Sequence, residues 1–552
     1  MLGGLAAVIS LVLALPVITI AILSFAPAPG VWPHLISTTL PYSLKETLLL
    51  MAGVAALTAV TGAGTAWLVT MYRFPGRGAF DWLLILPLAL PTYITAYCYA
   101  DFLDYTGPVQ GLVRAAFGFT SYRDYWFPEI RSLGGAIFVL SAVLYPYVYL
   151  TARASFALQS IHVLEVARTL GRTGTGALFA VALPMARPAL AAGVSLALME
   201  CLNDIGAVEY LGVRTLTLSV YAAWIQRSSL AGAAQLALVM LIFVFALLAL
   251  ERYGRRQLRY APGRADRPAP PENRLPPWKA AFAVLACAAS LTIGFLIPTG
   301  ILIRSAIVHG AEYGFSGYAS AAANSLLLAV SAAAITVVLA LVIGAALRLS
   351  RGSLVPYAAR ISALGYAIPG TIVALGLIIP LAAFDNLLSD FAKTHFGTPT
   401  GLLLSGSVFI LLLAYTVRFM AVALGSIESG WQRLSPNLDA AARTLGASPF
   451  AMLTSVHLPL LRPAIGAAAL LVFVDTMKEL PATLLLRPFN FETLATHIYT
   501  FASQEQFERS ALAALTVVGV GLIPLLLLHR ALKGAHSRDL LQPSHGATQD
   551  CI

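Results

Sequence analysis

The chain has 552 residues, of which 59% are hydrophobic and only 11% are charged. A soluble domain carries about 25% charged residues, so this composition excludes an ordinary soluble protein and indicates a polytopic membrane protein that lies in a lipid bilayer. The formal net charge of +10 could point to nucleic-acid binding, but the basic residues lie beside apolar stretches. They are better explained as determinants of membrane topology, and we expect no nucleic-acid partner.

Apolar stretches long enough to cross a bilayer, which takes about 20 residues, recur along the chain. The first begins without Lys or Arg, whereas a cleaved signal peptide has a basic start, so we interpret it as a membrane span. Twelve spans are predicted, at residues 3–25, 47–69, 82–102, 133–152, 189–207, 231–250, 280–303, 325–347, 361–383, 402–424, 464–484 and 511–528.

A stretch rich in Arg and Pro separates the sixth span from the seventh and has the composition of a solvated linker. The last residues are polar without an apolar period, which predicts a disordered tail. The expected organisation is a first transmembrane half at 1–251, a linker at 252–278, a second transmembrane half at 279–536 and the tail at 537–552.

The loop before the fifth span of each half carries the same motif. In the first copy an Ala/Leu/Arg run ends at Gly171, and Pro184 follows after twelve residues. In the second copy the run ends at Gly446, and Pro459 follows after twelve residues, 275 positions later. Such an ungapped match indicates an internal repeat, in which a helical run ends at Gly and a Leu-Pro turn enters the next span.

The repeat extends beyond this loop. Pro91 matches Pro369 at an offset of 278, as does Arg73 with Arg351. Six spans return the chain to its starting side, so the halves should be parallel repeats about an axis along the membrane normal. The predicted fold class is therefore an all-α integral membrane protein with twelve transmembrane helices in two parallel six-span repeats.

Orientation follows from the basic residues. Most of the 35 Lys and Arg fall in one set of loops, where we place the linker, both loop motifs, the tail and Arg418. The set richer in Lys and Arg is cytoplasmic, so both termini and both loop motifs are expected on the cytoplasmic side.

No nucleotide site is visible. The segment 171–176 is rich in Gly, but no Lys follows it and no strand precedes it, so it is not a phosphate-binding loop. No nucleophile–base pair or set of metal ligands was found either. The energy for any transport must come from another subunit or from an ion gradient.

Four carboxylates lie inside predicted spans, as two i, i+4 pairs at an offset of 275: Glu200, Asp204, Asp475 and Glu479. Each pair shares one helix face, and charges at this depth are costly unless they are paired or face water. They could line a cation path, because hard cations take oxygen ligands. They could equally form ion pairs, for example with Lys478 or Arg487, and cap the end of a span.

Aromatic residues also gather near span ends. A ferric tyrosinate site could be suggested by Tyr93, Tyr97, Tyr99, Asp101 and Asp104, but an interfacial aromatic anchor is favoured for the tyrosines. The aromatics of the loop 104–131 favour an interfacial belt, and a docking surface for a soluble partner is the alternative.

The repeated motif resembles the EAA loop of ABC importer permeases, the cytoplasmic segment that docks on the ATP-binding subunit. Residues 199–210 and 478–489 resemble signature stretches of the fused, two-half ferric-iron ABC permeases, and 86–91 and 365–370 resemble their third-span motifs. The resemblance implies a non-enzymatic permease of the bacterial inner membrane without a cofactor of its own. Two ATP-binding subunits would use ATP, and a periplasmic substrate-binding protein would deliver Fe(III).

On this resemblance, ten residues belong to the two ATPase-coupling loops: Glu165, Ala167, Arg168, Gly171, Pro184, Asp439, Ala442, Arg443, Gly446 and Pro459. The Glu of the motif is Glu165 in the first loop, but the second has Ala440 there and Asp439 one residue earlier. Two other functions stay open: an ABC permease for thiamine or a polyamine, and a gradient-driven secondary carrier with twelve spans.

Overall fold

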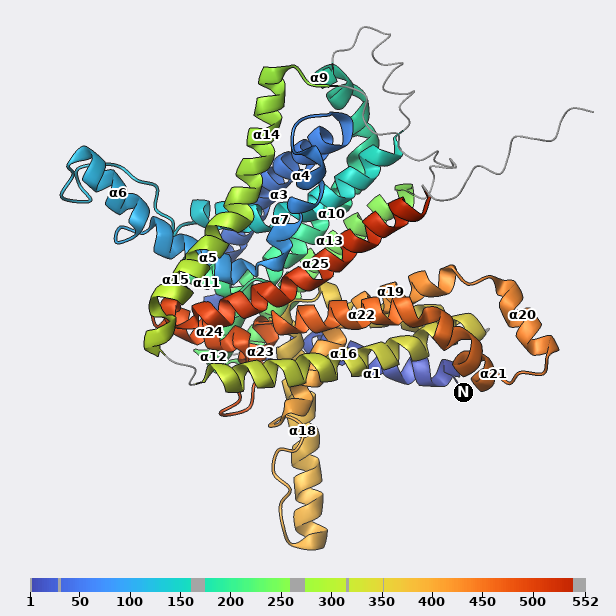
Figure 1. Cartoon of the computed structure of the whole chain (residues 1–552). Helices are drawn as coiled ribbons and strands as arrows, with labels where there is room; N and C mark the ends of the chain where they lie inside the picture. Colours follow the sequence, from blue (N-terminus) through green and yellow to red (C-terminus); the bar gives the residue numbers. More distant parts are fainter. Residues whose placement is uncertain are drawn as a thin grey trace, which may run out of the picture.

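The computed structural model describes residues 2–27, 31–159, 174–258, 274–313, 317–350 and 352–539. These residues form helices joined by short loops, and within them the only β-type pairing is an isolated bridge between Arg73 and Arg274. The all-α prediction is therefore confirmed (Figure 1).

The first half contains, in chain order, α1 (Leu2–Leu23), α2 (Val31–His34), η1 (Leu35–Thr39), α3 (Leu40–Met71), α4 (Arg77–Leu83), η2 (Leu86–Ala89), α5 (Thr92–Leu103), α6 (Pro108–Phe117), α7 (Leu133–Leu158), α9 (Gly174–Ala177), η3 (Leu178–Ala182), α10 (Leu183–Asn203), α11 (Gly206–Tyr210), α12 (Leu216–Ile225) and α13 (Leu230–Leu258).

The second half contains α14 (Pro277–Leu291), η4 (Thr292–Leu296), α15 (Ile297–Tyr313), α16 (Tyr318–Leu349), α17 (Val355–Ser362), η5 (Gly365–Ala367), α18 (Gly370–Phe396), α19 (Val408–Gln432), α20 (Pro436–Thr444), α21 (Pro449–Met452), η6 (Leu453–His457), α22 (Leu458–Met477), α23 (Pro481–Leu486), α24 (Leu494–Ser503), η7 (Phe507–Ser510) and α25 (Ala511–Asp539).

Among the described residues, 11 helices are long and apolar enough to cross a membrane. The number rises to 12 if the bent pair Arg77–Ala89 and Thr92–Phe117, which meets at 92°, forms one broken span. The break falls at Leu90-Pro91, where the ring of Pro91 disfavours a helical conformation of the preceding residue. With the bent pair counted as one span, the number equals the twelve predicted spans, and the bent pair lies at the third of them.

Several elements of the second half repeat those of the first at fixed offsets. Both ends of α16 lie 278 positions after those of α3, and both ends of η6 lie 275 positions after those of η3. These are the offsets at which the sequence repeats. The parallel arrangement of the halves about an axis stays a prediction.

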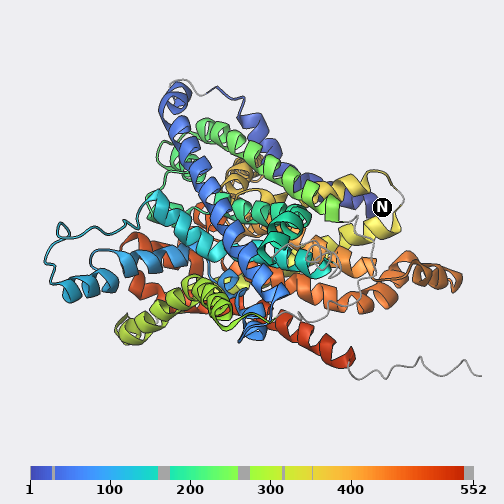
Figure 2. The ribbon, with the colours of Figure 1, turned by 90° about the horizontal axis from the view of Figure 1, so that it is seen from above.

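The first span of each half packs on the other half. Helix α1 lies against α16, α17 and α18, whereas α14 and α15 lie against α3 and α5 (Figures 1 and 2). Glycine permits the close approach on both sides. A Cβ at Gly376 of α18 would come within 2.4 Å of the carbonyl oxygen of Pro16, and one at Gly294 within 2.5 Å of that of Ala142. Each half therefore contacts the first span of the other half, which links the two halves. The sequence did not predict this packing.

The predicted boundaries of the linker and the tail differ from the helix ends. Helix α13 continues to Leu258 and α25 to Asp539, so each span runs on past the predicted end of its half. Residues 259–273 of the linker and 540–552 of the tail lie outside the described residues. The division into domains stays a prediction.

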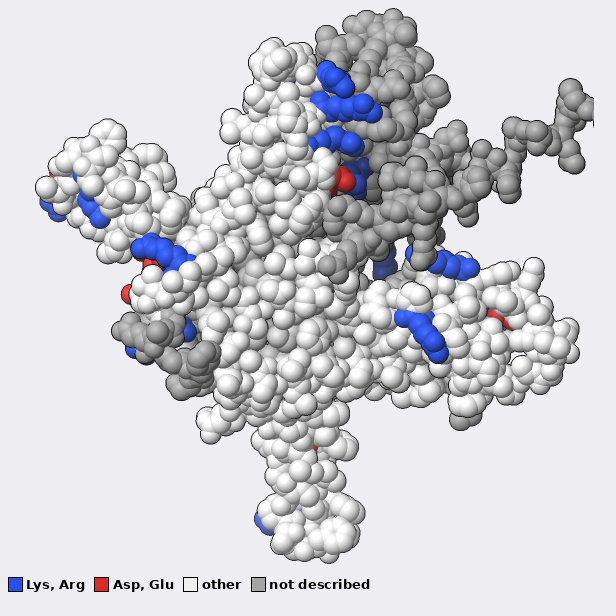
Figure 3. Space-filling view, viewed as in Figure 1, with Lys and Arg blue, Asp and Glu red and all other residues white. Residues whose placement is uncertain are grey.

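The space-filling view shows a central body almost free of charged side chains, with one group of Lys and Arg near α4 and α9 and others at the periphery (Figure 3). The Arg bias predicts that the end near α4 and α9 faces the cytoplasm. Reporter fusions after Arg77, within 255–275 and at the C-terminus should therefore all report a cytoplasmic location. The measurement is the activity of a reporter enzyme that works on one side of the membrane only. A periplasmic signal from 255–275 would overturn the scheme of six plus six spans.

Candidate functional site

A cavity of about 100 Å³ lies between the two halves, and all four predicted carboxylates line it. Glu200 and Asp204 come from the end of α10, while Asp475 and Glu479 come from the end of α22 and the turn after it. The structure thus brings together residues that are 275 positions apart in the sequence. Their individual contacts divide them into two pairs.

Asp204 and Glu479, which we call the capping carboxylates, hold the short helices that follow them. Asp204 accepts a hydrogen bond of 2.7 Å from the backbone N–H of Ala207 and another from the hydroxyl of Thr92. Glu479 accepts hydrogen bonds of 2.9 and 3.0 Å from the backbone N–H groups of Ala482 and Thr483. Both side chains are buried and satisfy the free N–H groups at a helix start, as capping residues do.

Arg418 is the buried counter-ion of Glu479. Its Nη1 donates to Oε1 of Glu479 at 2.9 Å and to Oδ1 of Asn203 at 3.0 Å, so it joins the two halves. Gly370 makes room for it, because a Cβ there would approach Nη1 of Arg418 to 2.5 Å. A buried pair of this kind is tolerated because each charge is neutralised and hydrogen-bonded.

Our placement of Arg418 in a cytoplasmic loop is therefore wrong. It lies inside α19 with 5% of its surface exposed, and its charge is used within the protein rather than for topology. The signal was present in the sequence, since a single Arg inside the predicted span 402–424 is expensive and points to a partner.

Glu200 and Asp475, which we call the cavity carboxylates, have looser contacts. Glu200 accepts one hydrogen bond of 3.1 Å from the hydroxyl of Tyr366, and Asp475 pairs with Lys478 at 2.9 Å. The pairing with Lys478 was one of those considered from the sequence. Both side chains are half-buried, so they are the acidic groups most able to meet a solute in the cavity.

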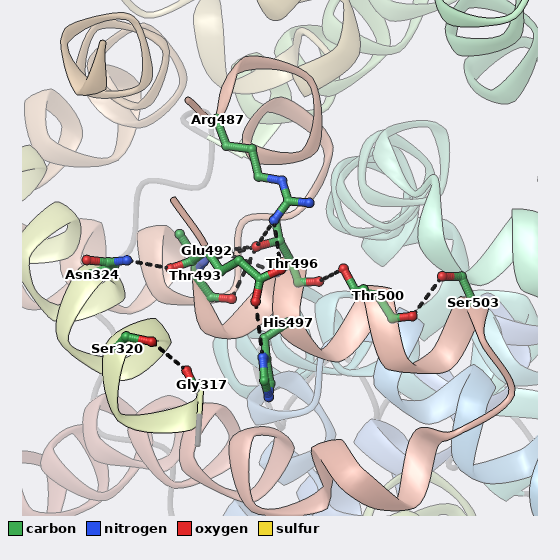
Figure 4. A network of polar contacts seen from close by, with 10 residues as sticks. All are labelled: Gly317, Ser320, Asn324, Arg487, Glu492, Thr493, Thr496, His497, Thr500 and Ser503. Carbon is green, nitrogen blue, oxygen red and sulfur yellow. Dashed lines mark hydrogen bonds and ion pairs between the residues drawn. The ribbon is translucent and has the colours of Figure 1, made fainter. Parts of the chain in front are cut away.

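Arg487, the other partner considered, lies elsewhere. Its Nη1 is 3.2 Å from Oε1 of Glu492, whose second oxygen is 3.3 Å from Nδ1 of His497 (Figure 4). The backbone carbonyl of Glu492 also accepts a hydrogen bond of 2.9 Å from Asn324. This network fixes the loop between α23 and α24 and does not reach the cavity carboxylates.

The tyrosines of α5 are buried in the protein. Tyr93 lines the cavity, Tyr97 packs edge-on against Tyr210 at a centroid distance of 4.6 Å, and the hydroxyl of Tyr99 donates to the carbonyl of Ile293 at 2.6 Å. They are core residues rather than the interfacial anchor predicted from the sequence. Among the residues that the structure describes, no three His, Cys, Asp or Glu side chains are arranged to hold a metal ion.

The predicted second coupling loop is the short helix α20 followed by a turn. Gly446 has φ of 78°, and the N–H groups of Gly446 and Ala447 bond back to the carbonyls of Arg443 and Ala442 at 3.0 Å each. A left-handed Gly with such bonds is a usual helix C-terminus. Arg443 on this helix is exposed, and Pro459 stands in the first turn of α22.

In the predicted first coupling loop, Glu165, Ala167, Arg168 and Gly171 lie outside the described residues. Pro184 is described and stands in the first turn of α10, as Pro459 does in α22. In both loops, therefore, a Pro stands in the first turn of the helix that follows.

Comparison with known proteins fits this arrangement. Residues 59–260 match the family model described as "Binding-protein-dependent transport system inner membrane component". The chain is also similar over most of its length to permease proteins. The "Fe(3+)-transport system permease protein FbpB 2" of Haemophilus influenzae is 26% identical, over 88% of this chain and 89% of that protein. This chain resembles the permeases of ABC importers over most of its length.

Two further relatives show how wide the family is. The "Probable ABC transporter permease protein y4fN" of Sinorhizobium fredii is 23% identical over 86% of the permease and 84% of that protein. The "Sulfate transport system permease protein CysT" of Escherichia coli is 32% identical over 33% of the permease and 62% of that protein. The permease is a multi-pass membrane protein and not itself an enzyme, and its family works with ATP-binding subunits and substrate-binding proteins.

Proposed function

We propose that this permease carries ferric iron across the bacterial inner membrane, with both termini in the cytoplasm. A periplasmic binding protein delivers Fe(III), and two ATP-binding subunits dock on the coupling loops at 164–188 and 439–463. The observation that carries the substrate is the similarity to an Fe(3+) permease over 88% of the chain. The chain brings no cofactor of its own, because the partner subunits use the ATP.

The cavity chemistry supports a hard cation as the substrate. Its lining holds four carboxylates and two basic residues, so acidic groups are in excess. Carboxylate oxygens are the ligands that hard cations prefer. Each carboxylate already has a partner in this state, so a passing ion would compete for it and be held weakly. A conduit needs such weak binding, because the ion has to leave as well as enter.

Alternating access would require the contacts between the halves to change. Tyr366, which donates to Glu200, lines both the cavity and a second hollow of about 590 Å³ formed mainly by α19 and α22. The second hollow is lined largely by Ala, Gly and Ser. In our proposal, closure of the ATP-binding subunits moves the coupling loops and the attached spans. The hydrogen bond between Tyr366 and Glu200 then breaks, which connects the cavity with the second hollow.

An organic cation is the second candidate for the substrate, because tyrosines line the cavity. Tyr93, Tyr147 and Tyr366 line the cavity, and aromatic faces attract organic cations such as thiamine or a polyamine. The two candidates share the machinery and differ in the substrate.

Uptake into proteoliposomes tests the proposal. Permease reconstituted with its ATP-binding subunits and binding protein should accumulate radioactive Fe(III) only when ATP is hydrolysed, and excess thiamine or spermidine should not compete. ATP-dependent uptake of thiamine or spermidine without Fe(III) uptake would replace iron by the second candidate. Uptake that persists without the ATP-binding subunits would instead support a secondary carrier.

A further inference from the structure

Asp439 of the second coupling loop points inward rather than toward a partner. Its carboxylate accepts hydrogen bonds of 2.8 Å from Nε of Arg348 and 2.9 Å from Nε2 of His457. Only 15% of the Asp439 side chain is exposed. The three residues come from the end of α16, the first turn of α20 and the end of η6, so their contacts tie the docking helix to two membrane spans.

An aromatic ring shields the histidine side of the contact from solvent. His457 is fully buried, and the ring of Trp431 packs edge-on against it at a centroid distance of 4.7 Å. Gly344 of α16 leaves space for this ring, since a Cβ there would lie 2.8 Å from Nε1 of Trp431. Because the site is shielded, its hydrogen bonds are stronger than those of an exposed ion pair.

Asp439 is held in its ionised form. Burial alone would raise the pKa of its carboxyl, but the hydrogen bonds and charges of Arg348 and His457 bring the pKa below its ordinary value. A carboxylate only accepts hydrogen bonds, so Nε2 of His457 carries the proton that is donated. Arg348 also donates from Nη2 to the carbonyl of Leu434 at 3.2 Å, which fixes the turn before α20.

The first half cannot form the same contact. The residues at the matching offsets of 278 and 275 are Thr70, Leu164 and Ala182, and none of them carries a charge. In the part of the first half that the structure describes, the carbonyl of Ala182 instead accepts a hydrogen bond of 3.0 Å from Gln159. The first loop, similar in sequence motif, therefore lacks the charged residues of this contact at the matching positions.

We propose that Arg348, Asp439 and His457 form a positioning clamp, which makes the second coupling helix a rigid extension of α16 and α22. Asp439 then does not replace the missing Glu of the motif as a docking contact, because its carboxylate is occupied inside the permease. The inference rests on the proposed role of α20 in docking the ATP-binding subunit. The clamp itself is testable in the permease alone.

Hydrogen exchange of α20, followed by mass spectrometry in lipid nanodiscs, measures the clamp without any partner. Asp439→Asn and His457→Leu should each speed exchange of the α20 amides by about tenfold, since the first removes the charge that both donors bind and the second removes one of the donors. His457→Gln, which can still donate to Asp439, should stay near the parental rate. Asp390→Asn is the matched control, because Asp390 is an exposed acid on α18, a different helix from α20.

The double variant separates positioning from docking. Because Asp439 binds both Arg348 and His457, Asp439→Asn with His457→Leu should be no worse than Asp439→Asn alone if His457 acts only through Asp439. Both single variants should still co-purify with the ATP-binding subunit, yet hydrolyse about tenfold more ATP for each Fe(III) ion transported. Parental exchange rates in both single variants would overturn the clamp. Faster exchange with unchanged coupling would keep the clamp and contradict the proposed role of α20.

Discussion

Replacing Gly446 by Val is expected to lower ATP-dependent uptake at least about tenfold while the permease still inserts into the membrane. Gly446 has φ of 78°, a conformation that costs a side chain with a Cβ about 1–2 kcal/mol. A Cβ at this position would meet no atom within 4 Å, so the strain is in the backbone alone. That cost is too small to unfold the transmembrane bundle but enough to re-aim a short docking helix.

Uptake, ATP hydrolysis and co-purification of the ATP-binding subunit measure this effect. Gly466→Val is the matched control, because Gly466 lies on the exposed face of α22 and a Cβ there also meets no atom within 4 Å. Gly171→Val should act as Gly446→Val does, and we expect the larger effect at Gly171, since the second loop lacks the Glu of the motif. Transport at the parental rate by both loop variants would remove the coupling role.

Span positions could be predicted because they depend on local composition. A run of about 20 apolar residues is recognisable wherever it packs, so the hydropathy of 402–424 located α19. The same reasoning could not place α1, because whether a span packs on its own half or on the other depends on contacts between distant residues. Gly376 against Pro16 is one such contact, and neither residue alone signals the other.

The site was predicted only in part, because the sequence shows local spacing but not contacts between distant residues. The i, i+4 spacing and the offset of 275 brought out Glu200, Asp204, Asp475 and Glu479, and the structure places them in one cavity. Arg418 was missed because counting basic residues treats a buried Arg like a loop Arg. Which carboxylate caps a helix also depends on the turn after the span, where Asp204 and Glu479 meet N–H groups that Glu200 and Asp475 cannot reach.

The two pairs of carboxylates should therefore respond differently to neutralisation. Asp204→Asn with Glu479→Gln is expected to lower the thermal stability and the amount of permease in the membrane. Glu479→Gln leaves Arg418 buried without its counter-ion, and breaking a buried pair costs about 3–5 kcal/mol. Part of the N–H capping is lost as well, because an amide is a weaker acceptor than a carboxylate.

Glu200→Gln with Asp475→Asn is the matched double change at the cavity pair. Both side chains are half-buried, and the partner left behind, Lys478, has a third of its side chain exposed, so the cost in stability should be small. If these two groups line the cation path, uptake of Fe(III) should fall several-fold while thermal unfolding and binding of the ATP-binding subunit stay parental. Unfolding in detergent and uptake in proteoliposomes, measured on both double variants, separate the roles. Parental uptake by the Glu200/Asp475 variant would exclude those groups from the path, and parental stability of the Asp204/Glu479 variant would contradict the capping role.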